Sequence, residues 1–344
     1  GRGYLDSWRG GYQQVAADCA GTINMSDWLN QCHFGDCIET MRRMPDGIAQ
    51  TCVTSPPYFG LRDYGHDGQL GLESTPDEYI KAMVEVFRCV RDVLADDGTL
   101  WLNIGDSYAS NPASGGAQSS RMTGGEHKRT PPERKYQRPD GLKPKDLIGI
   151  PWLLAFALRA DGWYLRQDII WHKPNPMPES VRDRCTKAHE YMFLLSKSER
   201  YYFDSDAMKE PAESNKGNGK SFRGGGSYTA NNAFNNHQTK ERETHGNVPN
   251  ESGMRNRRSV WTVATRPYKG AHFATFPPAL IEPCILAGSA PGGIVLDPFM
   301  GSGTTAQVAL LHGRQYLGCE LNESYKPLQD ERLQQPSFQF LEAA

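Results

Sequence analysis

The feature that most constrains the fold is a glycine-rich turn near the end of the chain. Residues 294–296 are predicted to form a strand, Gly301, Ser302 and Gly303 follow, and residues 304–311 are predicted to form a helix. Glycines permit a tight turn and let a ligand approach bare backbone. A strand, turn and helix of this kind predict an α/β sheet with a nucleoside-containing ligand at the carboxyl end of a strand.

Strands and helices alternate along most of the chain, which indicates a mostly parallel sheet with helices on both faces. In residues 77–94, for example, the apolar side chains recur with the period of a helix. The predicted strands are 31–34, 48–53, 99–104, 163–171, 190–195, 294–296 and 316–319, and the predicted helices are 37–44, 77–94, 144–160, 277–287, 304–311 and one from Glu323.

Two polar segments carry local positive charge, although the formal net charge of the chain is -2. Residues 121–145 and residues 215–258 each contain eight basic and three acidic residues. Basic polar segments on a neutral body suit a phosphate backbone, and solvated loops without a partner would have the same composition. Long loops inside a compact domain are usually functional or disordered, so both segments are candidates for binding.

Composition argues against several classes of protein. The eight cysteines are scattered without a CxxC pair, which predicts reduced thiols and no disulfide framework. Cys32, His33 and Cys37 lack the usual spacing of a zinc site, so we expect no metal. No apolar run approaches the ~18 residues of a membrane span, so we expect no membrane association.

An acid and an aromatic residue precede the glycine turn, and a second acid follows the next strand. Asp297 and Phe299 suit a cationic amino-acid group and an adenine ring, and Glu320 is placed to accept ribose hydroxyls. The turn is no Walker A loop, because no lysine precedes Thr304. A dinucleotide-binding turn fits the glycine pattern equally well.

The segment Ser55-Pro56-Pro57-Tyr58 follows a predicted buried strand. Proline is a poor central-strand residue, so the segment is expected just past the strand end, where ligands of α/β sheets lie. Its prolines fix the backbone, so that the Ser55 hydroxyl and the Pro56 carbonyl can both accept hydrogens from an exocyclic amino group. The amino lone pair would then face an electrophilic methyl, with Tyr58 stacked on the ring. A proline turn closing a strand is the alternative.

These two motifs, in this order, resemble the β class of S-adenosylmethionine-dependent DNA amino-methyltransferases. Residues 55–64 are similar to those of bacterial and phage site-specific enzymes, residues 100–106 to the strand after the catalytic helix, and residues 169–175 with His189 and Glu190 to motifs near the target base. The resemblance implies an α/β fold, a circular permutation of the Rossmann-like methyltransferase sheet, with a small target-recognition insertion. Its domains would be an arm at 1–27, a catalytic half at 28–203 with a basic loop at 107–143, a partly flexible target-recognition region at 204–258, and a cofactor-binding half at 259–344.

The resemblance also implies the cofactor, S-adenosyl-L-methionine, which leaves as S-adenosyl-L-homocysteine, with no metal. Asp36 occupies the place of an acid that contacts the cofactor adenine, and it also suits the N-cap of a helix with Glu39 in a capping box. The residues 272–277 resemble the motif that lines the methionine end. The implied cofactor residues are Asp36, Phe273, Thr275, Asp297, Phe299, Gly301, Ser302, Gly303, Thr304, Glu320 and Asn322.

Serine at the first position of the catalytic motif is typical of cytosine-N4 enzymes, so Ser55 favours N4-methylcytosine, with adenine N6 as the alternative. The implied partner is double-stranded DNA, from which the target base must be flipped out. The candidate DNA contacts are Arg62, Lys128, Arg129, Lys173, Arg255, Arg257 and Arg258.

Further properties follow from the same resemblance. Many members serve restriction-modification systems, and a homodimer is frequent in the β class. The location would be cytoplasmic in a bacterium or phage host and nuclear in a eukaryote. Two other functions keep the same motifs: a nicotinamide-dependent oxidoreductase using the glycine turn, which leaves residues 55–58 without a role, and a DNA-binding module that has lost catalysis.

Overall fold

The computed structural model describes residues 25–60, 68–109, 142–212, 252–265 and 276–334. The chain divides into a larger unit, residues 1–204 and 259–344, and a smaller unit, Ser205–Arg258. Among the described residues, every helix is too short or too polar to cross a membrane.

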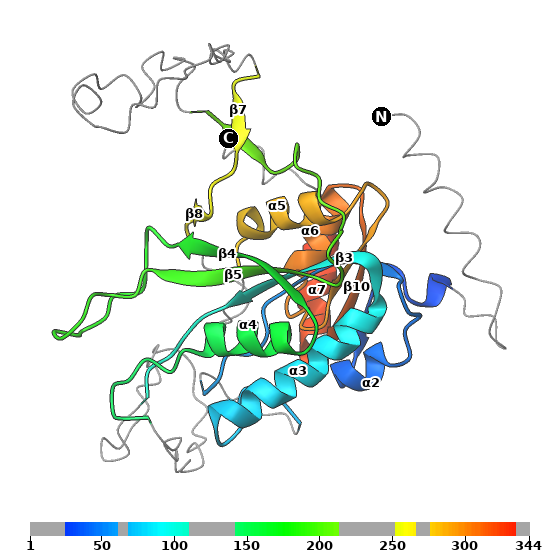
Figure 1. The fold of residues 1–344 in the computed structure, drawn as a ribbon. Helices are drawn as coiled ribbons and strands as arrows, with labels where there is room; N and C mark the ends of the chain where they lie inside the picture. The colour runs from blue at the N-terminus through cyan, green and yellow to red at the C-terminus, as the bar shows by residue number, and fades with distance from the viewer. Residues whose placement is uncertain (1–24, 61–67, 110–141, 213–251, 266–275, 335–344) are drawn as a thin grey trace, which may run out of the picture. The chain divides into compact units, whose positions relative to one another are not determined.

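The larger unit is built on an eight-stranded sheet with the order β1-β10-β9-β2-β3-β5-β4-β8 (Figure 1). Only β5 runs antiparallel to its neighbours, which are β3 and β4. The strands are β1 Gln31–Phe34, β2 Ala49–Thr54, β3 Leu94–Ile104, β4 Tyr164–His172, β5 His189–Ser196, β8 Val260–Thr262, β9 Ile294–Asp297 and β10 Gln315–Glu320. The predicted mostly parallel α/β sheet is confirmed.

Helices cover both faces of this sheet, with α2, α3 and α4 on one face and α5 and α6 on the other (Figure 1). Their bounds, with those of two short 3-10 turns, are η1 Met25–Asp27, α2 Cys37–Met41, α3 Pro76–Val93, α4 Ile150–Ala160, α5 Pro278–Gly288, α6 Thr304–Leu311, η3 Glu323–Tyr325 and α7 Lys326–Gln334. The central strands β2 and β9 lie between these two layers of helices and are buried along their whole length.

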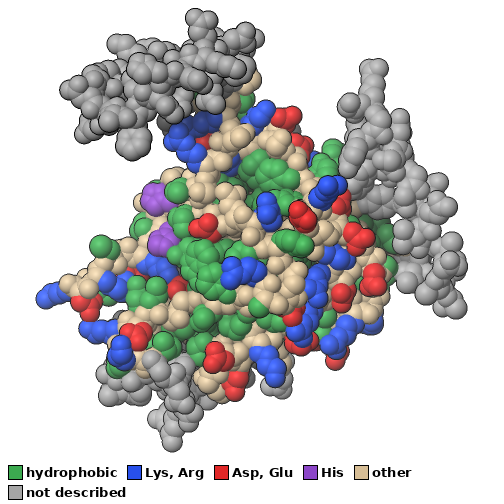
Figure 2. Space-filling model, in the orientation of Figure 1, with side chains coloured by type: hydrophobic (Ala, Val, Ile, Leu, Met, Phe, Trp, Pro, Cys, Tyr) green, Lys and Arg blue, Asp and Glu red, His purple; other side chains and the backbone are tan. Residues whose placement is uncertain are grey.

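Charge is mixed on the described surface. Lys and Arg side chains lie among Asp and Glu side chains over the face that Figure 2 shows. This agrees with the formal net charge of -2. Attraction of a polyanion would therefore have to come from local basic segments rather than from the whole molecule.

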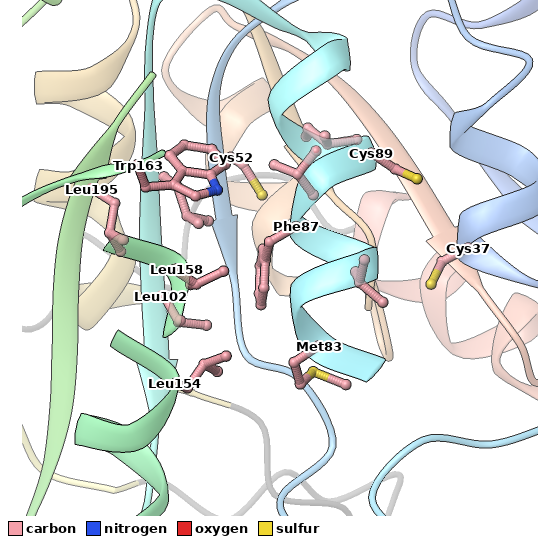
Figure 3. Packing of buried hydrophobic residues seen from close by; sticks show 14 of the residues in the cluster. Cys37, Cys52, Met83, Phe87, Cys89, Leu102, Leu154, Leu158, Trp163 and Leu195 are labelled. Carbon is pink, nitrogen blue, oxygen red and sulfur yellow. The ribbon is translucent and has the colours of Figure 1, made fainter. Parts of the chain in front are cut away.

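The core beneath α3 follows from the apolar spacing of that helix. Met83 and Phe87 lie one turn apart on the buried side and pack toward Leu154 and Leu158 of α4 and Leu102 of β3 (Figure 3). These side chains are fully buried or nearly so. The helix starts at Pro76, where the preceding Thr75 side chain accepts a hydrogen bond from the Glu78 amide. Local capping and apolar period therefore agree on one orientation of α3.

The order of strands explains the circular permutation. β2, from the first part of the chain, pairs in parallel with β9, from the last part. β9 continues into the glycine turn and β2 into the Ser-Pro-Pro-Tyr motif, so both motifs leave the same edge of the sheet. The fold is a circularly permuted Rossmann-like sheet, in which the Ser-Pro-Pro-Tyr motif precedes the glycine turn along the chain.

Two predicted helix bounds were wrong. The helix expected over 144–160 begins at Ile150, because Gly149 takes a left-handed φ of 86° and the Asp106 carboxylate accepts from the Gly149 and Ile150 amides as a cap. The helix expected over 37–44 ends at Met41.

One strand is longer than expected. The strand expected over 99–104 begins at Leu94, so residues 96–98 lie inside β3, where the register with β2 shifts between Ala49 and Thr51. Such an irregularity admits the polar residues Asp96 and Asp97 into a strand without disturbing the buried pairs further on.

The smaller unit contains two strands that the sequence did not predict. β6, Lys209–Pro211, pairs antiparallel with β7, Met254–Asn256. Arg255 of β7 donates to the Glu210 carboxylate of β6 at 2.9 Å. Strands of three residues are too short to show a period, which is why this pair escaped prediction.

Candidate active site

The two predicted motifs meet at a single buried carboxylate. Asp297, the last residue of β9, is 1% exposed. Thr54, the last residue of β2, donates its hydroxyl to Asp297 Oδ1 at 2.6 Å, although the two residues are 243 positions apart. Thr305, in the first turn of α6, donates to Oδ2 at 2.6 Å, and the Phe299 amide donates to Oδ1 at 3.0 Å. Asp297 therefore ties the strand before the catalytic motif to the glycine turn.

Burial makes Asp297 an unusual carboxyl group. Desolvation raises its pKa from 3.8 to about 6, against the opposing effect of the hydroxyl and amide donors. Its acceptor positions toward Thr54, Thr305 and Phe299 are occupied. In this structure Asp297 joins the two motifs, and the contact with a cofactor expected from the sequence stays a prediction.

The raised pKa predicts a specific pH dependence of stability. Because the native carboxyl binds a proton more readily than the unfolded one, its stabilising contribution is complete below pH 3.8 and is lost as the pH rises through about 6. Asp297→Asn removes this titration. The unfolding free energy of the variant relative to wild type should therefore rise by about 2 kcal/mol between pH 4 and pH 7. Denaturant unfolding at both pH values measures this, and a constant difference would contradict it.

The glycine turn is held from outside by hydrogen bonds to its backbone. Gly301 and Gly303 have φ of 53° and 84°, a region that favours glycine. The Gly301 amide donates to Glu320 Oε2 at 2.8 Å, and the Gln329 side chain of α7 donates to the Gly301 carbonyl at 2.7 Å. Glu320 also accepts from the Asn322 amide at 2.9 Å. The predicted cofactor residues Gly301, Gly303, Glu320 and Asn322 are thus brought together.

Within the turn, Ser302 and Thr304 differ in their partners. The Ser302 hydroxyl is buried and has no hydrogen-bond partner among the described residues. The Thr304 hydroxyl accepts from the Arg332 guanidinium of α7. A buried polar group without a partner is costly, so a ligand or an ordered water at the turn would satisfy Ser302.

Sequence reasoning missed Gln329 and Arg332. Both are buried polar side chains three positions apart on α7, and this spacing places them on one face of the helix. Polar residues on the buried face of the last helix were the sequence signal that could have indicated them.

Asp36 lies beside this turn, where it caps a helix and remains accessible to a ligand. It follows β1, which pairs with β10, and the adjacent Gly35 amide donates to the Glu320 carbonyl at 2.9 Å. The Asp36 carboxylate accepts from the Glu39 amide at 2.8 Å, so it caps α2. Its side chain stays exposed, which leaves it open to a ligand. Phe273 and Thr275 lie outside the described residues.

The catalytic motif follows β2 directly. The Tyr79 hydroxyl of α3 donates to the Pro57 carbonyl at 2.9 Å and holds the backbone after the prolines. Within the described ranges no donor reaches the carbonyl of Pro56, and Ser55 is half-buried. Ser55 and Pro56, which carry the two acceptors predicted for an amino group, are thus the first two residues after the strand.

The Tyr58 side chain is held in place by hydrogen bonds of its hydroxyl. That hydroxyl donates to Glu190 Oε2 at 2.8 Å and lies 3.3 Å from Asn103 Oδ1. Burial and the Glu190 charge raise the pKa of Tyr58 well above its ordinary value. Lys173 forms an ion pair with Glu190 and lies 4.3 Å above the Trp171 ring. The position of the Tyr58 ring is thus fixed by the hydrogen bonds of its hydroxyl.

Residues 49–331 match a protein family described as DNA methylase. The chain belongs to this family. The type II methyltransferase M.Cfr9I of Citrobacter freundii is 48% identical over 303 residues, which cover 87% of this chain and 86% of that protein. M.SmaI of Serratia marcescens is 48% identical over 299 residues, which cover 87% and 89%. The predicted β-class DNA amino-methyltransferase is confirmed at this level.

Solved structures agree with the fold of this DNA methyltransferase. The PvuII DNA methyltransferase, described as cytosine-N4-specific, superposes with a TM-score of 0.58 at 17% identity and covers 89% of this chain and 87% of its own. A DNA modification methylase of Thermus thermophilus, solved with S-adenosyl-L-methionine, has a TM-score of 0.54 at 22% identity and covers 88% and 93%. Membership of the DNA methylase family argues against the alternative function of a nicotinamide-dependent oxidoreductase.

The described residues among the predicted DNA contacts of the methyltransferase belong to both units. Lys173 belongs to the Tyr58 network, and its side chain is 19% exposed. Arg255 is paired with Glu210, and Arg257 and Arg258 close the smaller unit. Contacts of these residues with DNA stay predictions. Arg62, Lys128 and Arg129 lie outside the described residues.

Gly105 is the close neighbour of Tyr58 in the methyltransferase. A Cβ at this position would lie 2.7 Å from Tyr58 Cε2 and 3.3 Å from the Glu190 side chain. Because Glu190 holds the Tyr58 hydroxyl, the ring cannot move without breaking that hydrogen bond. Gly105→Ala should lower the single-turnover rate of methyl transfer about tenfold, an effect of about 1.4 kcal/mol. Unchanged S-adenosylhomocysteine affinity, measured by calorimetry, is the control, and a wild-type rate would contradict the prediction.

Proposed function

We propose that this chain transfers a methyl group from S-adenosyl-L-methionine to the exocyclic N4 of a flipped-out cytosine in double-stranded DNA. The supporting observation is the hydrogen bond between Thr54 and Asp297, which places the Ser-Pro-Pro-Tyr motif beside the glycine turn. A donor at the turn and an amino group at the motif would then lie at the same sheet edge, as in-line transfer requires.

The residues around the glycine turn fit the cofactor. S-adenosyl-L-methionine, when bound, supplies the electrophilic methyl group. Glu320 at the end of β10 would accept the ribose hydroxyls, and Asp36 at the end of the neighbouring β1 would contact the adenine. Ser302, a buried hydroxyl without a described partner, suits a polar group of the ligand. The solved Thermus thermophilus methylase shares the fold and carries this cofactor.

The catalytic motif supplies the contacts with the base. Ser55 Oγ and the Pro56 carbonyl would each accept one amino hydrogen, which turns the nitrogen lone pair toward the methyl group. The fixed Tyr58 ring would stack on the flipped base and offset part of the few kcal/mol that unstacking costs. Proton loss follows methyl transfer, since a serine hydroxyl is no base at neutral pH.

Cytosine is the proposed target because the motif begins with Ser55. The PvuII enzyme, whose description names cytosine N4, has a similar fold. Adenine N6 is the second candidate, since the family covers both amino groups. The smaller unit, Ser205–Arg258, is the proposed target-recognition region, with Arg255, Arg257 and Arg258 as candidate contacts to phosphates or guanine edges.

Nucleoside mass spectrometry tests the proposal. The protein is incubated with S-adenosylmethionine carrying a deuterated methyl and with unmethylated mixed-sequence duplex DNA, which is then digested. Labelled N4-methyldeoxycytidine is the expected product. Labelled N6-methyldeoxyadenosine would overturn the cytosine assignment and keep the fold and cofactor. Cofactor binding with no labelled nucleoside, on duplex or single-stranded DNA, would overturn the activity and favour a non-catalytic DNA-binding protein.

A further inference from the structure

The hydroxyl of Tyr58 has one proton and two acceptors competing for it. Glu190 Oε2 lies at 2.8 Å and Asn103 Oδ1 at 3.3 Å. Burial holds the Tyr58 pKa well above its ordinary value, so the hydroxyl stays protonated and donates. An ionised carboxylate only accepts. The Tyr58 proton therefore points toward Glu190, and the lone pairs of its oxygen remain for another donor.

The surroundings of Glu190 keep this direction from reversing. Lys173 pairs with Glu190, and both side chains are less than one-fifth exposed, at 19% and 17%. The Asn103 amide nitrogen donates to the Tyr191 carbonyl at 3.0 Å, which turns the Asn103 oxygen toward Tyr58. Neither neighbour can donate to Tyr58 without losing a hydrogen bond or an ion pair.

The direction of the Tyr58 hydrogen bond also determines how the Ser55 hydroxyl is oriented. Ser55 Oγ lies 3.5 Å from the Tyr58 oxygen and donates toward it. A serine hydroxyl has one proton and two lone pairs. With its proton directed to Tyr58, Ser55 presents only lone pairs to whatever approaches from the other side. At 3.5 Å the hydrogen bond is long, and such contacts tighten when substrate binds.

We propose that Glu190, held by Lys173, fixes the hydrogen-bond direction of the catalytic motif, so that Ser55 is an acceptor and the pocket selects a base with an amino group over one with a keto group. The proposal rests on the proposed function. Glu190 and Lys173 would not touch the base. They are positioning residues that act through Tyr58.

The chemistry of the bases makes this selection effective. Cytosine presents an amino donor at position 4, whereas uracil and thymine present a keto acceptor there. Two acceptors, Ser55 Oγ and the Pro56 carbonyl, match the amino group. Against a keto oxygen they leave three acceptors facing one another without a proton, and sites built around a hydrogen bond reject such an analogue strongly. A Ser55 hydroxyl free to rotate could donate to the keto oxygen, and the selection would weaken.

The experiment measures the binding preference for cytosine over uracil. Duplexes containing the methylated site, mapped with the wild-type enzyme, carry cytosine or uracil at the target position opposite an abasic site, so that neither base pays for unpairing. Affinity is measured by fluorescence anisotropy with S-adenosylhomocysteine present. If the mapped target is adenine, hypoxanthine replaces uracil as the keto analogue.

The wild type should bind the cytosine duplex at least tenfold more tightly than the uracil duplex. Glu190→Gln, whose amide can donate to Tyr58, and Tyr58→Phe, which lacks the hydroxyl, should each reduce the ratio toward one. Glu179→Gln is the matched control, because it removes the partner of Arg184 in another half-buried ion pair and should keep the ratio. S-adenosylhomocysteine affinity and melting temperature check that each variant is folded.

A ratio near one in the wild type, or a wild-type ratio in folded Glu190→Gln and Tyr58→Phe, would overturn the inference even if methylation is observed. Absence of methylated nucleosides with every DNA would instead overturn the proposed function. The two failures are therefore distinguishable.

Discussion

Ser55→Ala is expected to lower the single-turnover rate of methyl transfer by roughly 10²-fold or more. The reason is that one of the two acceptors for the target amino group is lost at the reacting atom, where a single preorganised hydrogen bond is worth about 3 kcal/mol. The Pro56 carbonyl remains, so a residual rate should persist. Rapid-quench transfer of labelled methyl, with enzyme in excess over DNA, measures the chemical step.

Two controls accompany this variant. S-adenosylhomocysteine affinity should be unchanged, because Ser55 follows β2 whereas the cofactor turn follows β9. Ser324→Ala, an exposed serine, should keep the wild-type rate. Full activity in Ser55→Ala would refute the mechanism, and a loss of cofactor affinity equal to the loss of rate would show that the effect is structural.

Asp297→Ala is expected to reduce the free energy of unfolding by about 3–5 kcal/mol, since a buried donor left without its acceptor costs about 1–3 kcal/mol. The hydroxyls of Thr54 and Thr305 and the amide of Phe299 all donate to this carboxylate. The variant should also lose cofactor affinity, because the glycine turn is no longer tied to β2. Chemical denaturation and calorimetric titration measure the two effects.

Asp297→Asn keeps the size of the side chain and part of its hydrogen bonding, so its comparison with Asp297→Ala measures what these hydrogen bonds contribute to stability. Its side-chain oxygen can still accept from Thr54 and Phe299, so it should fold better than the alanine variant at neutral pH. Equal stability of the two variants would show that the Asp297 hydrogen bonds contribute little and that packing alone joins the motifs.

The sequence predicted the strand and helix series because burial imposes a period that is visible locally. The helix 304–311 and the strand 31–34 match the structure residue for residue. The bounds of α4 and α2 were wrong because they depend on caps. The cap of α4 uses Asp106, a residue distant along the chain. The antiparallel direction of β5 was not predicted, because a buried apolar run has the same pattern in either direction.

The site was predicted in parts and assembled only by the fold. Ser55 and Asp297 were both singled out, each from its own motif, and the hydrogen bond from Thr54 that joins the motifs was not. Glu190 and Asn103 were noticed only through family resemblance. Their contact with Tyr58 depends on β3 and β5 being neighbours in the sheet. Gln329 and Arg332 had no motif to mark them.

By itself, the sequence determined the fold class, the two motifs and their order along the chain, because these depend on glycine, proline and apolar period within short segments. Only the tertiary structure decided which side chains form hydrogen bonds with one another. The pairing of β2 with β9 brought Thr54 to Asp297, and the pairing of β3 with β5 brought Asn103 and Glu190 to one Tyr58 hydroxyl. Hydrogen bonds act over about 3 Å, a distance that only folding can set between residues far apart in the chain.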